Sequence, residues 1–426
     1  MFKNISFIFY CCSEFFKNFI ESAVKSGAAG YFTSDKTKIF ENAQVVFFVP
    51  DTKEAYLRLA NFHKNKINPF TIMITGSSGK TTVKEMMYCV FSLAGKTVKS
   101  VLNHNNETGL CQTLSAVEND TEYLIVEAGM RGFGEIELIS EYAEPDIGVI
   151  VNSGTAHIGR LGSELNIAKA KFEITTHLKP DGILISHDNK LIKQINDNKH
   201  KTIYFSLDDK NLKIKEMTSE SSLFEYKGID YKLSVPGLHN VQNALSVIEA
   251  ALWSNISVEL IKKGLENFVP IEKRWNIVQI GGYNIINDSY NSNPESVKAA
   301  IQTFLEYTKG VKVLVLGDMG ELGKNEVLYH KFGALEVAKG GRAFENADRK
   351  EQHQKPVANG LHSAVDGRDG APDRAALERL RRFRQQRPHF RQLVVPRCQR
   401  VLQVIDDPVV IQKVHLQNGM APHPCG

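Results

Sequence analysis

The sequence predicts an α/β protein in which a central, doubly wound domain with a phosphate-binding loop is flanked by two smaller modules. A buried strand, a glycine-rich turn and the start of a helix follow one another at residues 71–83. Short apolar runs alternate with amphipathic runs up to residue 340, which is typical of sheets covered by helices. The hydrophobic fraction of 42% suits a globular protein, and no apolar run is long enough to predict a membrane-spanning helix.

The 426 residues are expected to form three modules and a tail. Residues 1–69 form an N-terminal α/β module, residues 70–272 the central domain, and residues 273–340 a truncated, Rossmann-like C-terminal module. Up to residue 340 the chain has 33 Lys and 4 Arg, whereas residues 341–426 have 3 Lys and 12 Arg. We interpret this change as two coding compositions joined by a frameshift, a fusion or an assembly error, and we expect an unrelated, disordered tail.

The N-terminal module is expected to contain two helices and two strands, at residues 15–25, 52–64, 27–34 and 43–50. In the second helix, Ala55, Leu59 and Phe62 fall on one side, which is the side expected to be buried. The apolar patch at residues 5–12 is compatible with a poor signal peptide. Its short apolar core and the lack of a small-residue cleavage site favour a buried strand instead.

The run TIMITGSSGKTT, Thr71–Thr82, has the strand, glycine turn and helix start of a phosphate-binding loop. Glycines allow backbone N–H groups to approach phosphate oxygens, and a helix N-terminus adds partial positive charge. Lys80 is expected to contact the outer phosphates, and the Thr81 hydroxyl to join a magnesium coordination sphere. The residues expected to hold the nucleotide are Gly76, Ser77, Ser78, Gly79, Lys80, Thr81 and Thr82. An ordinary strand-to-helix turn is the alternative.

Two further apolar strands of the central domain end near residues that can bind a metal. The run EYLIVEAGM contains Glu127 at its end, and the run DIGVIVNSG is followed by His157. Because the carboxyl ends of parallel strands meet at one edge of a sheet, both side chains are expected near Lys80 and Thr81. The alternatives are a salt bridge at a strand end for Glu127 and a hydrogen-bonded loop histidine for His157.

The sequence of the second half of the central domain is less diagnostic of function. A helix at residues 167–178 carries Lys171, and most helical lysines are solvated. Short runs within residues 201–234, including TIYFSL, are expected to be antiparallel strands appended to the domain. A longer helix follows with Asn240 and Asn243 in its first turns, where polar side chains often cap a helix.

The C-terminal module begins with the pattern strand, polar loop and helix at residues 284–304. Pro294 occupies a first-turn position of that helix. A buried strand then leads into a glycine-rich loop with Asp318 and Glu321. Two strands and two helices are too few to close a core of their own.

Nine motifs in this order resemble the ATP-dependent Mur ligases of peptidoglycan synthesis, over about residues 17–340. They are TGSSGKTT (75–82), NHNNETG (103–109), EAGMRGFGEI (127–136), PDIGVIVNSGTAH (145–157), AKAKFEI (168–174), PGLHNVQNAL (236–245), KRW (273–275), DSYNSNPESVKAA (288–300) and VLGDMGELG (315–323). A series of this length is far more specific than the phosphate-binding loop alone.

The resemblance implies a ligase that uses ATP and Mg²⁺ and acts in the cytoplasm. A substrate carboxylate would take the γ-phosphoryl group, and an amine would then attack the acyl phosphate. NHNNETG, DSYNSNP and LGDMGELG are most similar to the members that join D-alanyl-D-alanine to UDP-N-acetylmuramoyl-tripeptide. Residues 1–69 would bind the uridine nucleotide, and the protein would be a monomer without nucleic-acid partners.

The resemblance also implies roles for individual residues. Magnesium would be held by Thr81, Glu127, His157 and Lys171, the last after carbamylation. The catalytic set would be Lys80, Lys171, His157 and Arg274, with Arg274 meeting the γ-phosphate. The nucleotide base and ribose would contact the segment with His239, Asn240 and Asn243 and the loop with Asp288, Tyr290 and Asn291. Asn105 and Asn106 would contact the muramyl peptide.

Two departures from the family pattern leave alternatives open. The opening strand and glycine-rich loop of the family's first domain are not visible in residues 1–16, and no family motif follows residue 340. The alternatives are therefore a nucleotide-binding remnant that no longer ligates and a sibling ligase, including the folate polyglutamylating relatives. The basic segment at residues 376–395 has only Phe383 and Phe390 interleaved, which does not favour nucleic-acid binding.

Overall fold

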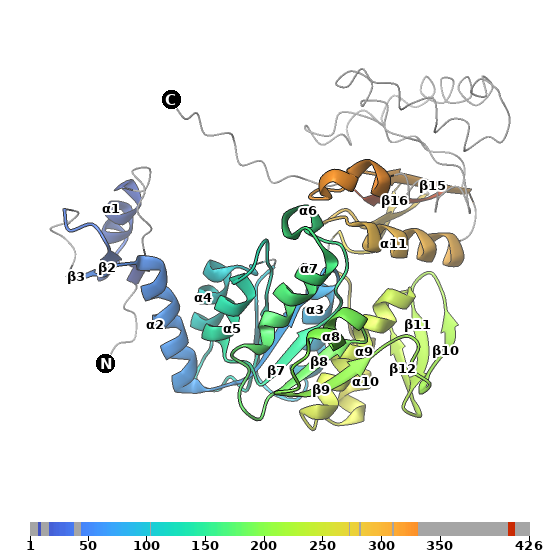
Figure 1. Cartoon of the computed structure of the whole chain (residues 1–426), viewed down its shortest axis with the longest axis horizontal. Coiled ribbons are helices and arrows are strands. Elements are labelled where there is room, and N and C mark those ends of the chain that lie inside the picture. Colours follow the sequence, from blue (N-terminus) through green and yellow to red (C-terminus); the bar gives the residue numbers. More distant parts are fainter. Residues whose placement is uncertain are drawn as a thin grey trace, which may run out of the picture. The chain divides into compact units, whose positions relative to one another are not determined.

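The computed structural model describes most of the chain up to residue 330 and one later strand (Figure 1). The described residues are 7–9, 17–37, 44–102, 104–271, 273–280, 283–308, 311–330 and 408–413. The chain divides into two compact units, Met1–Pro270 with Glu321–Asn325 and Ile271–Gly320 with Glu326–Gly426. Within the described ranges, no helix has the length and apolar character needed to cross a bilayer.

A six-stranded, all-parallel sheet in the order β5-β6-β4-β7-β8-β9 is the centre of the first unit. Its strands are β4 (Phe70–Thr75), β5 (Thr97–Lys99), β6 (Tyr123–Glu127), β7 (Ile147–Ile150), β8 (Ile183–His187) and β9 (Lys201–Phe205). The strand order reverses at β4, which pairs with β6 on one side and β7 on the other. Open α/β sheets bind their ligands at such a switch point, beyond the carboxyl ends of the strands.

Alternation along β4 divides the hydrophobic core between the two faces of the sheet. Ile72 and Ile74 belong to one buried cluster and Met73 to the other. The first cluster includes side chains of α3 (Lys80–Phe91), α9 (Leu238–Trp253) and α10 (Val258–Glu266). The second includes side chains of α4 (Glu107–Ser115), α5 (Glu135–Ala143), α6 (Ile158–Leu161), α7 (Glu164–Phe172), η2 (Glu173–Thr175) and α8 (Lys190–Ile195).

A separate antiparallel sheet of three strands follows β9 (Figure 1). It consists of β10 (Leu212–Met217), β11 (Ser222–Tyr226) and β12 (Ile229–Leu233). The assignment of the run TIYFSL to the antiparallel strands was wrong, because β9 pairs in parallel with β8 at the edge of the central sheet. An edge strand with one pairing partner has the same short, alternating pattern in either orientation, so the sequence did not distinguish the two.

The N-terminal module contains a parallel sheet in the order β1-β2-β3 and two helices. The elements are β1 (Phe7–Phe9), α1 (Lys17–Lys25), β2 (Gly30–Thr33), β3 (Val45–Phe48) and α2 (Thr52–Ile67). The expected face of α2 was wrong: Leu59 and Phe62 are 41% and 68% exposed, whereas Leu57 and Ala60 are buried against the second cluster. The remaining positions of the expected strand at residues 5–12 lie outside the described residues.

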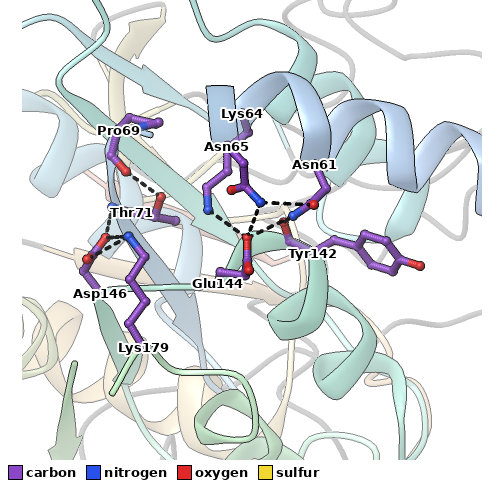
Figure 2. A network of polar contacts seen from close by, with 9 residues as sticks. All are labelled: Asn61, Lys64, Asn65, Pro69, Thr71, Tyr142, Glu144, Asp146 and Lys179. Carbon is purple, nitrogen blue, oxygen red and sulfur yellow. Dashed lines mark hydrogen bonds and ion pairs between the residues drawn. The ribbon is translucent and has the colours of Figure 1, made fainter. Parts of the chain in front are cut away.

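A polar network joins α2 to the segment between α5 and β7 (Figure 2). Glu144 ends α5 in the left-handed conformation and accepts hydrogen bonds from Asn65 at 2.6 Å and Asn61 at 3.1 Å. Its Oε2 lies 3.5 Å from Nζ of Lys64, a lysine with no exposed surface. Asp146 accepts a hydrogen bond from the backbone N–H of Thr71 at 2.7 Å. This network lies at the amino ends of β4 and β7.

The second unit has a four-stranded sheet in the order β13-β14-β16-β15. Its elements are β13 (Asn276–Ile280), β14 (Tyr283–Asn287), α11 (Pro294–Tyr307), β15 (Val311–Leu316) and β16 (Pro408–Lys413), and η3 (Gly323–Asn325) belongs to the first unit. The predicted pair of strands corresponds to β14 and β15, while β13 and β16 were not expected. β16 comes from the arginine-rich segment and pairs in parallel with both β14 and β15. The rest of that segment, including residues 376–395, lies outside the described residues.

Candidate functional site

The turn between β4 and α3 has the backbone that a phosphate-binding loop requires. Gly79 precedes α3 with φ 78°, a left-handed conformation that glycine adopts without strain. A Cβ atom on Gly79 would lie 2.7 Å from Oδ1 of Asn243, so a larger residue would force the Asn243 side chain to move. Lys80 begins α3 and donates a hydrogen bond from Nζ to the carbonyl of Gly76 at 2.7 Å. The lysine of the loop thus hydrogen-bonds to the loop's own backbone.

The segment after β7 holds the other side of this loop. Asn152 Oδ1 accepts from the N–H of Ser78 at 2.9 Å, and Asn152 Nδ2 donates to Ser78 Oγ at 3.1 Å. Ser77 Oγ accepts from the N–H of Gly154 at 2.9 Å. Asn152 is a site residue that was not predicted. The polar run NSGTAH directly after a buried strand was the signal that could have identified it.

Glu127 connects three segments at the carboxyl end of β6. It is 2% exposed, and its Oε1 accepts hydrogen bonds from Thr81 Oγ1 and from Asn105 Nδ2, both at 3.1 Å. Its Oε2 accepts no hydrogen bond from the described residues and lies 3.5 Å from Nζ of Lys84. The predicted proximity of Glu127 to the phosphate-binding loop is present in the structure. Lys84 was not predicted as part of this site.

His157 follows β7 with φ 67° and precedes the short helix α6. Its Nδ1 contacts the carboxylate of Glu321, which also accepts from Arg160 at 3.0 Å. Burial lowers the pKa of His157, attraction to Glu321 partly offsets this, and the charges of Lys80 and Lys171 lower it further. Because Nδ1 is engaged with Glu321, a ligand of His157 would have to use the other ring nitrogen, Nε2.

Lys171 lies in α7 and is 1% exposed, so the default of a solvated helical lysine does not apply. Burial lowers its pKa well below the usual value of a lysine, and the charge of Lys80 adds to this effect. Among the described residues, no carboxylate lies within ion-pair distance of it. A lysine in this environment favours the neutral, nucleophilic amine.

The two residues predicted to bind substrate, Asn105 and Asn106, have different contacts in the structure. Asn105 contacts Glu127, and its carbonyl accepts from the N–H of Gly129 at 2.8 Å. Asn106 caps α4 by accepting from the N–H of Gly109 at 3.0 Å. Asn240 is buried in the first turn of α9 and donates to the carbonyl of Pro236 at 2.7 Å. Contact of these side chains with a substrate or a nucleotide stays a prediction.

The remaining predicted residues belong to the second unit. The guanidinium of Arg274 stacks on the ring of Tyr290 at 4.3 Å. Asn291 Oδ1 accepts from the N–H of Ser292 at 2.8 Å, and Asp288 lies in the same loop after β14. Within this unit the structure therefore brings Arg274 next to the loop expected to meet ribose and base. Their roles toward ATP stay predictions.

The donor set around Glu127 fits Mg²⁺ and does not resemble a softer metal site. In the described part of the chain, no three His, Cys, Asp or Glu side chains come together as a metal cluster. Magnesium is commonly held by one or two carboxylates, with waters and phosphate oxygens completing its coordination. Glu127 and the Thr81 hydroxyl, 3.1 Å apart beside the phosphate-binding loop, supply such oxygen ligands. His157 and Lys171 remain predicted ligands.

Comparison with known families matches both units. The Mur ligase middle domain matches residues 74–251, and the Mur ligase glutamate ligase domain matches residues 273–366. The UDP-N-acetylmuramoyl-tripeptide–D-alanyl-D-alanine ligase of Bacillus subtilis (strain 168) is 37% identical over 320 residues, covering 74% of this chain and 70% of that protein. The enzyme of the same name from Escherichia coli (strain K12) is 31% identical over 354 residues, covering 79% and 76%.

Solved structures agree with this assignment. A crystal structure of MurF from Acinetobacter baumannii is 26% identical, with a TM-score of 0.73, covering 96% of this chain and 87% of that chain. The MurF ligase of Thermotoga maritima, solved in complex with ADP, has a TM-score of 0.76 at 21% identity and covers 96% and 94%. The order of motifs, the fold and these relatives together show that the chain belongs to the Mur ligase family.

Proposed function

We propose that this protein is an ATP-dependent ligase that adds D-alanyl-D-alanine to UDP-N-acetylmuramoyl-tripeptide in peptidoglycan synthesis. One observation carries the proposal: Glu127 contacts both Thr81 of the phosphate-binding loop and Asn105 of the motif NHNNETG. A single carboxylate thus links the nucleotide loop to the segment expected to receive the muramyl peptide. We also propose that the enzyme acts as a monomer in the cytoplasm and that residues 1–69 bind the uridine nucleotide.

The proposed reaction has two steps. The terminal carboxylate of the tripeptide attacks the γ-phosphorus of ATP, so that ADP leaves and an acyl phosphate forms. The amine of D-alanyl-D-alanine then attacks the acyl carbon, and phosphate leaves as the peptide bond forms. Little covalent chemistry is asked of the protein, whose task is to align two substrates and to neutralise phosphate charge.

The residues near Glu127 suit these tasks. Lys80 and the N–H groups at the start of α3 face the position of the outer phosphates. Thr81 and Glu127 would hold Mg²⁺, which when bound neutralises phosphate charge. We propose that Lys171, buried in α7 with a lowered pKa, adds as a neutral amine to carbon dioxide and loses one N–H proton to solvent, and that the resulting carbamate would hold a second Mg²⁺. In the second unit, Arg274 would meet the γ-phosphate.

Release of phosphate from ATP tests the proposal directly. With Mg²⁺ present, we expect release only when both UDP-N-acetylmuramoyl-tripeptide and D-alanyl-D-alanine are added. Matched reactions with L-glutamate, L-alanine or a diamino acid in place of D-alanyl-D-alanine should show no more than background. A product larger than the tripeptide nucleotide by one dipeptide, measured by mass spectrometry, would identify the bond formed.

Other outcomes of that experiment define the alternatives. Release with another amine would make the protein a sibling ligase of the family. Nucleotide binding without release with any amine would make it a remnant that binds ATP but does not ligate. The change of composition after residue 340 favours testing this last outcome, because the family's third domain is expected to supply residues to the amine substrate.

A further inference from the structure

The feature that the proposed mechanism leaves unused is Lys84, one helical turn after Lys80 in α3. Its side chain has no exposed surface, and its Nζ donates a hydrogen bond to the carbonyl of Leu102 at 2.6 Å. The same Nζ lies 3.3 Å from Oε1 of Glu85 and 3.5 Å from Oε2 of Glu127. A lysine has three N–H bonds, and here three oxygens surround them.

These oxygens belong to different parts of the site. Glu127 is the proposed magnesium ligand, and Lys84 faces its Oε2 while Thr81 and Asn105 face its Oε1. Lys84 thus lies against one carboxylate oxygen, while the phosphate-binding loop contacts the other. Removal of a group that orients a metal ligand typically lowers metal affinity or activity by about 10- to 100-fold.

The second partner of Lys84, the carbonyl of Leu102, belongs to the loop that contains Asn105. The described residues of this loop, 100–102 and 104–106, have a further contact with the end of β6: Ser100 Oγ accepts from the N–H of Glu127 at 3.1 Å. In contrast, the side chains of Val101 and Leu102 are 58% and 71% exposed. Lys84 thus holds the backbone of this segment at Leu102, and the N–H of Glu127 holds the side chain of Ser100, while the side chains of Val101 and Leu102 are exposed.

Burial of the Lys84 charge carries a desolvation cost that a methionine of similar length would not have. We propose that Lys84 is a positioning residue: it holds Glu127 and the Leu102 carbonyl together, so that binding of the magnesium nucleotide orders the 100–106 loop for the muramyl peptide. This inference rests on the proposed function. According to this proposal, α3 connects the nucleotide site to the site of the muramyl peptide.

Lys84→Met tests the proposal, and Lys64→Met is a matched control. Lys64 is equally buried, and its Nζ also lies 3.5 Å from a carboxylate oxygen, but its partner Glu144 is at the amino end of the sheet. For Lys84→Met we expect the KM for the tripeptide nucleotide to rise about tenfold or more. The KM for ATP should rise less, because Glu127 keeps its hydrogen bonds from Thr81 and Asn105. Lys84→Arg, which keeps a donor, should recover part of the difference.

Hydrogen exchange provides a readout that does not require turnover. In the full-length wild-type protein, addition of MgADP should slow amide exchange in residues 100–106. This slowing should be lost in Lys84→Met and kept in Lys64→Met. If Lys84→Met is not recovered as folded protein, the same measurement on Lys84→Gln takes its place.

Several results would overturn the inference. Exchange in the loop that does not respond to MgADP in the wild type is one, and a response that survives in Lys84→Met is another. Equal increases in both KM values would indicate a general structural role. A wild-type protein without D-alanyl-D-alanine-dependent phosphate release would refute the proposed function, whereas the exchange experiment would still decide on Lys84.

Discussion

The central sheet carries a buried lysine and a carboxylate at each end, and the two pairs differ in what surrounds them. At the amino ends of the strands, Glu144 Oε2 accepts hydrogen bonds from Asn61 and Asn65 and pairs with Lys64 (Figure 2). At the carboxyl ends, Glu127 Oε2 also lies 3.5 Å from a buried lysine, Lys84, but accepts no hydrogen bond from the described residues. Saturation of hydrogen bonds is typical of a structural network, and an unsatisfied buried oxygen is typical of a site that receives a ligand.

Position in the sheet explains this difference. Parallel strands direct the N-termini of their following helices to the carboxyl edge, where partial positive charge attracts anions. The amino edge lacks this feature, so polar groups there serve to join elements. Asp146 illustrates this role, because it binds both the N–H of Thr71 and Lys179. Mutations at the two edges should therefore separate binding from stability.

Lys80→Ala should have the largest effect and should act on binding alone. We expect nucleotide affinity to fall about 100-fold, since a charged hydrogen bond to phosphate contributes about 1.5–3 kcal/mol. Isothermal titration with ADP and Mg²⁺ measures this change, and the midpoint of urea unfolding should stay near the wild-type value. Unchanged affinity would refute the assignment of the phosphate-binding loop.

Glu127→Gln should have a smaller effect that depends on the metal. The variant keeps the shape of the side chain but removes the charge that is expected to hold Mg²⁺ beside Thr81. Magnesium affinity in the presence of ADP should fall about 10- to 100-fold, whereas metal-free ADP binding should change little. Titration of Mg²⁺ at constant ADP measures the difference. Equal losses with and without magnesium would contradict a metal role for Glu127.

Glu144→Gln should have the smallest effect and should act on stability alone. Burial raises the pKa of Glu144, but hydrogen bonds from Asn65 and Asn61 and the Lys64 charge outweigh burial, so the pKa lies below its usual value. A carboxylate with a lowered folded-state pKa stabilises above the pKa of the unfolded chain, and this contribution is lost as pH falls through the folded-state pKa.

At pH 7 we therefore expect Glu144→Gln to lower the free energy of unfolding by about 1 kcal/mol, because the group is partly exposed. The difference from wild type should shrink as pH falls below about 4.5. Urea unfolding at pH 7 and near pH 4 measures both values. Nucleotide affinity should not change, and a loss of affinity in this variant would show that the two edges are coupled.

The predicted site residues show which contacts can be inferred from local sequence patterns. Glu127 and the phosphate-binding loop were expected together because strand ends in a parallel sheet share an edge, and Thr81 contacts Glu127 in the structure. Lys84 and Asn152 were missed. Each acts through a contact with residues distant in the chain. Asn152 could have been identified from the polar run after its strand, whereas Lys84 stands in a pattern that does not differ from an ordinary helix. Glu321 was noted in its loop, but its contact with His157 was not foreseen.

Motif order and hydrophobic periodicity determined the central fold, the family and the phosphate-binding loop, because these depend on residues close together in sequence. Tertiary structure decided which face of α2 is buried, that β9 pairs in parallel, and that β16 inserts between β14 and β15. It also decided that Lys171 and Lys84 are buried. Burial and strand pairing depend on which surfaces, distant in the sequence, pack together. The residues next to a lysine or an edge strand in the sequence do not reveal which surface covers it.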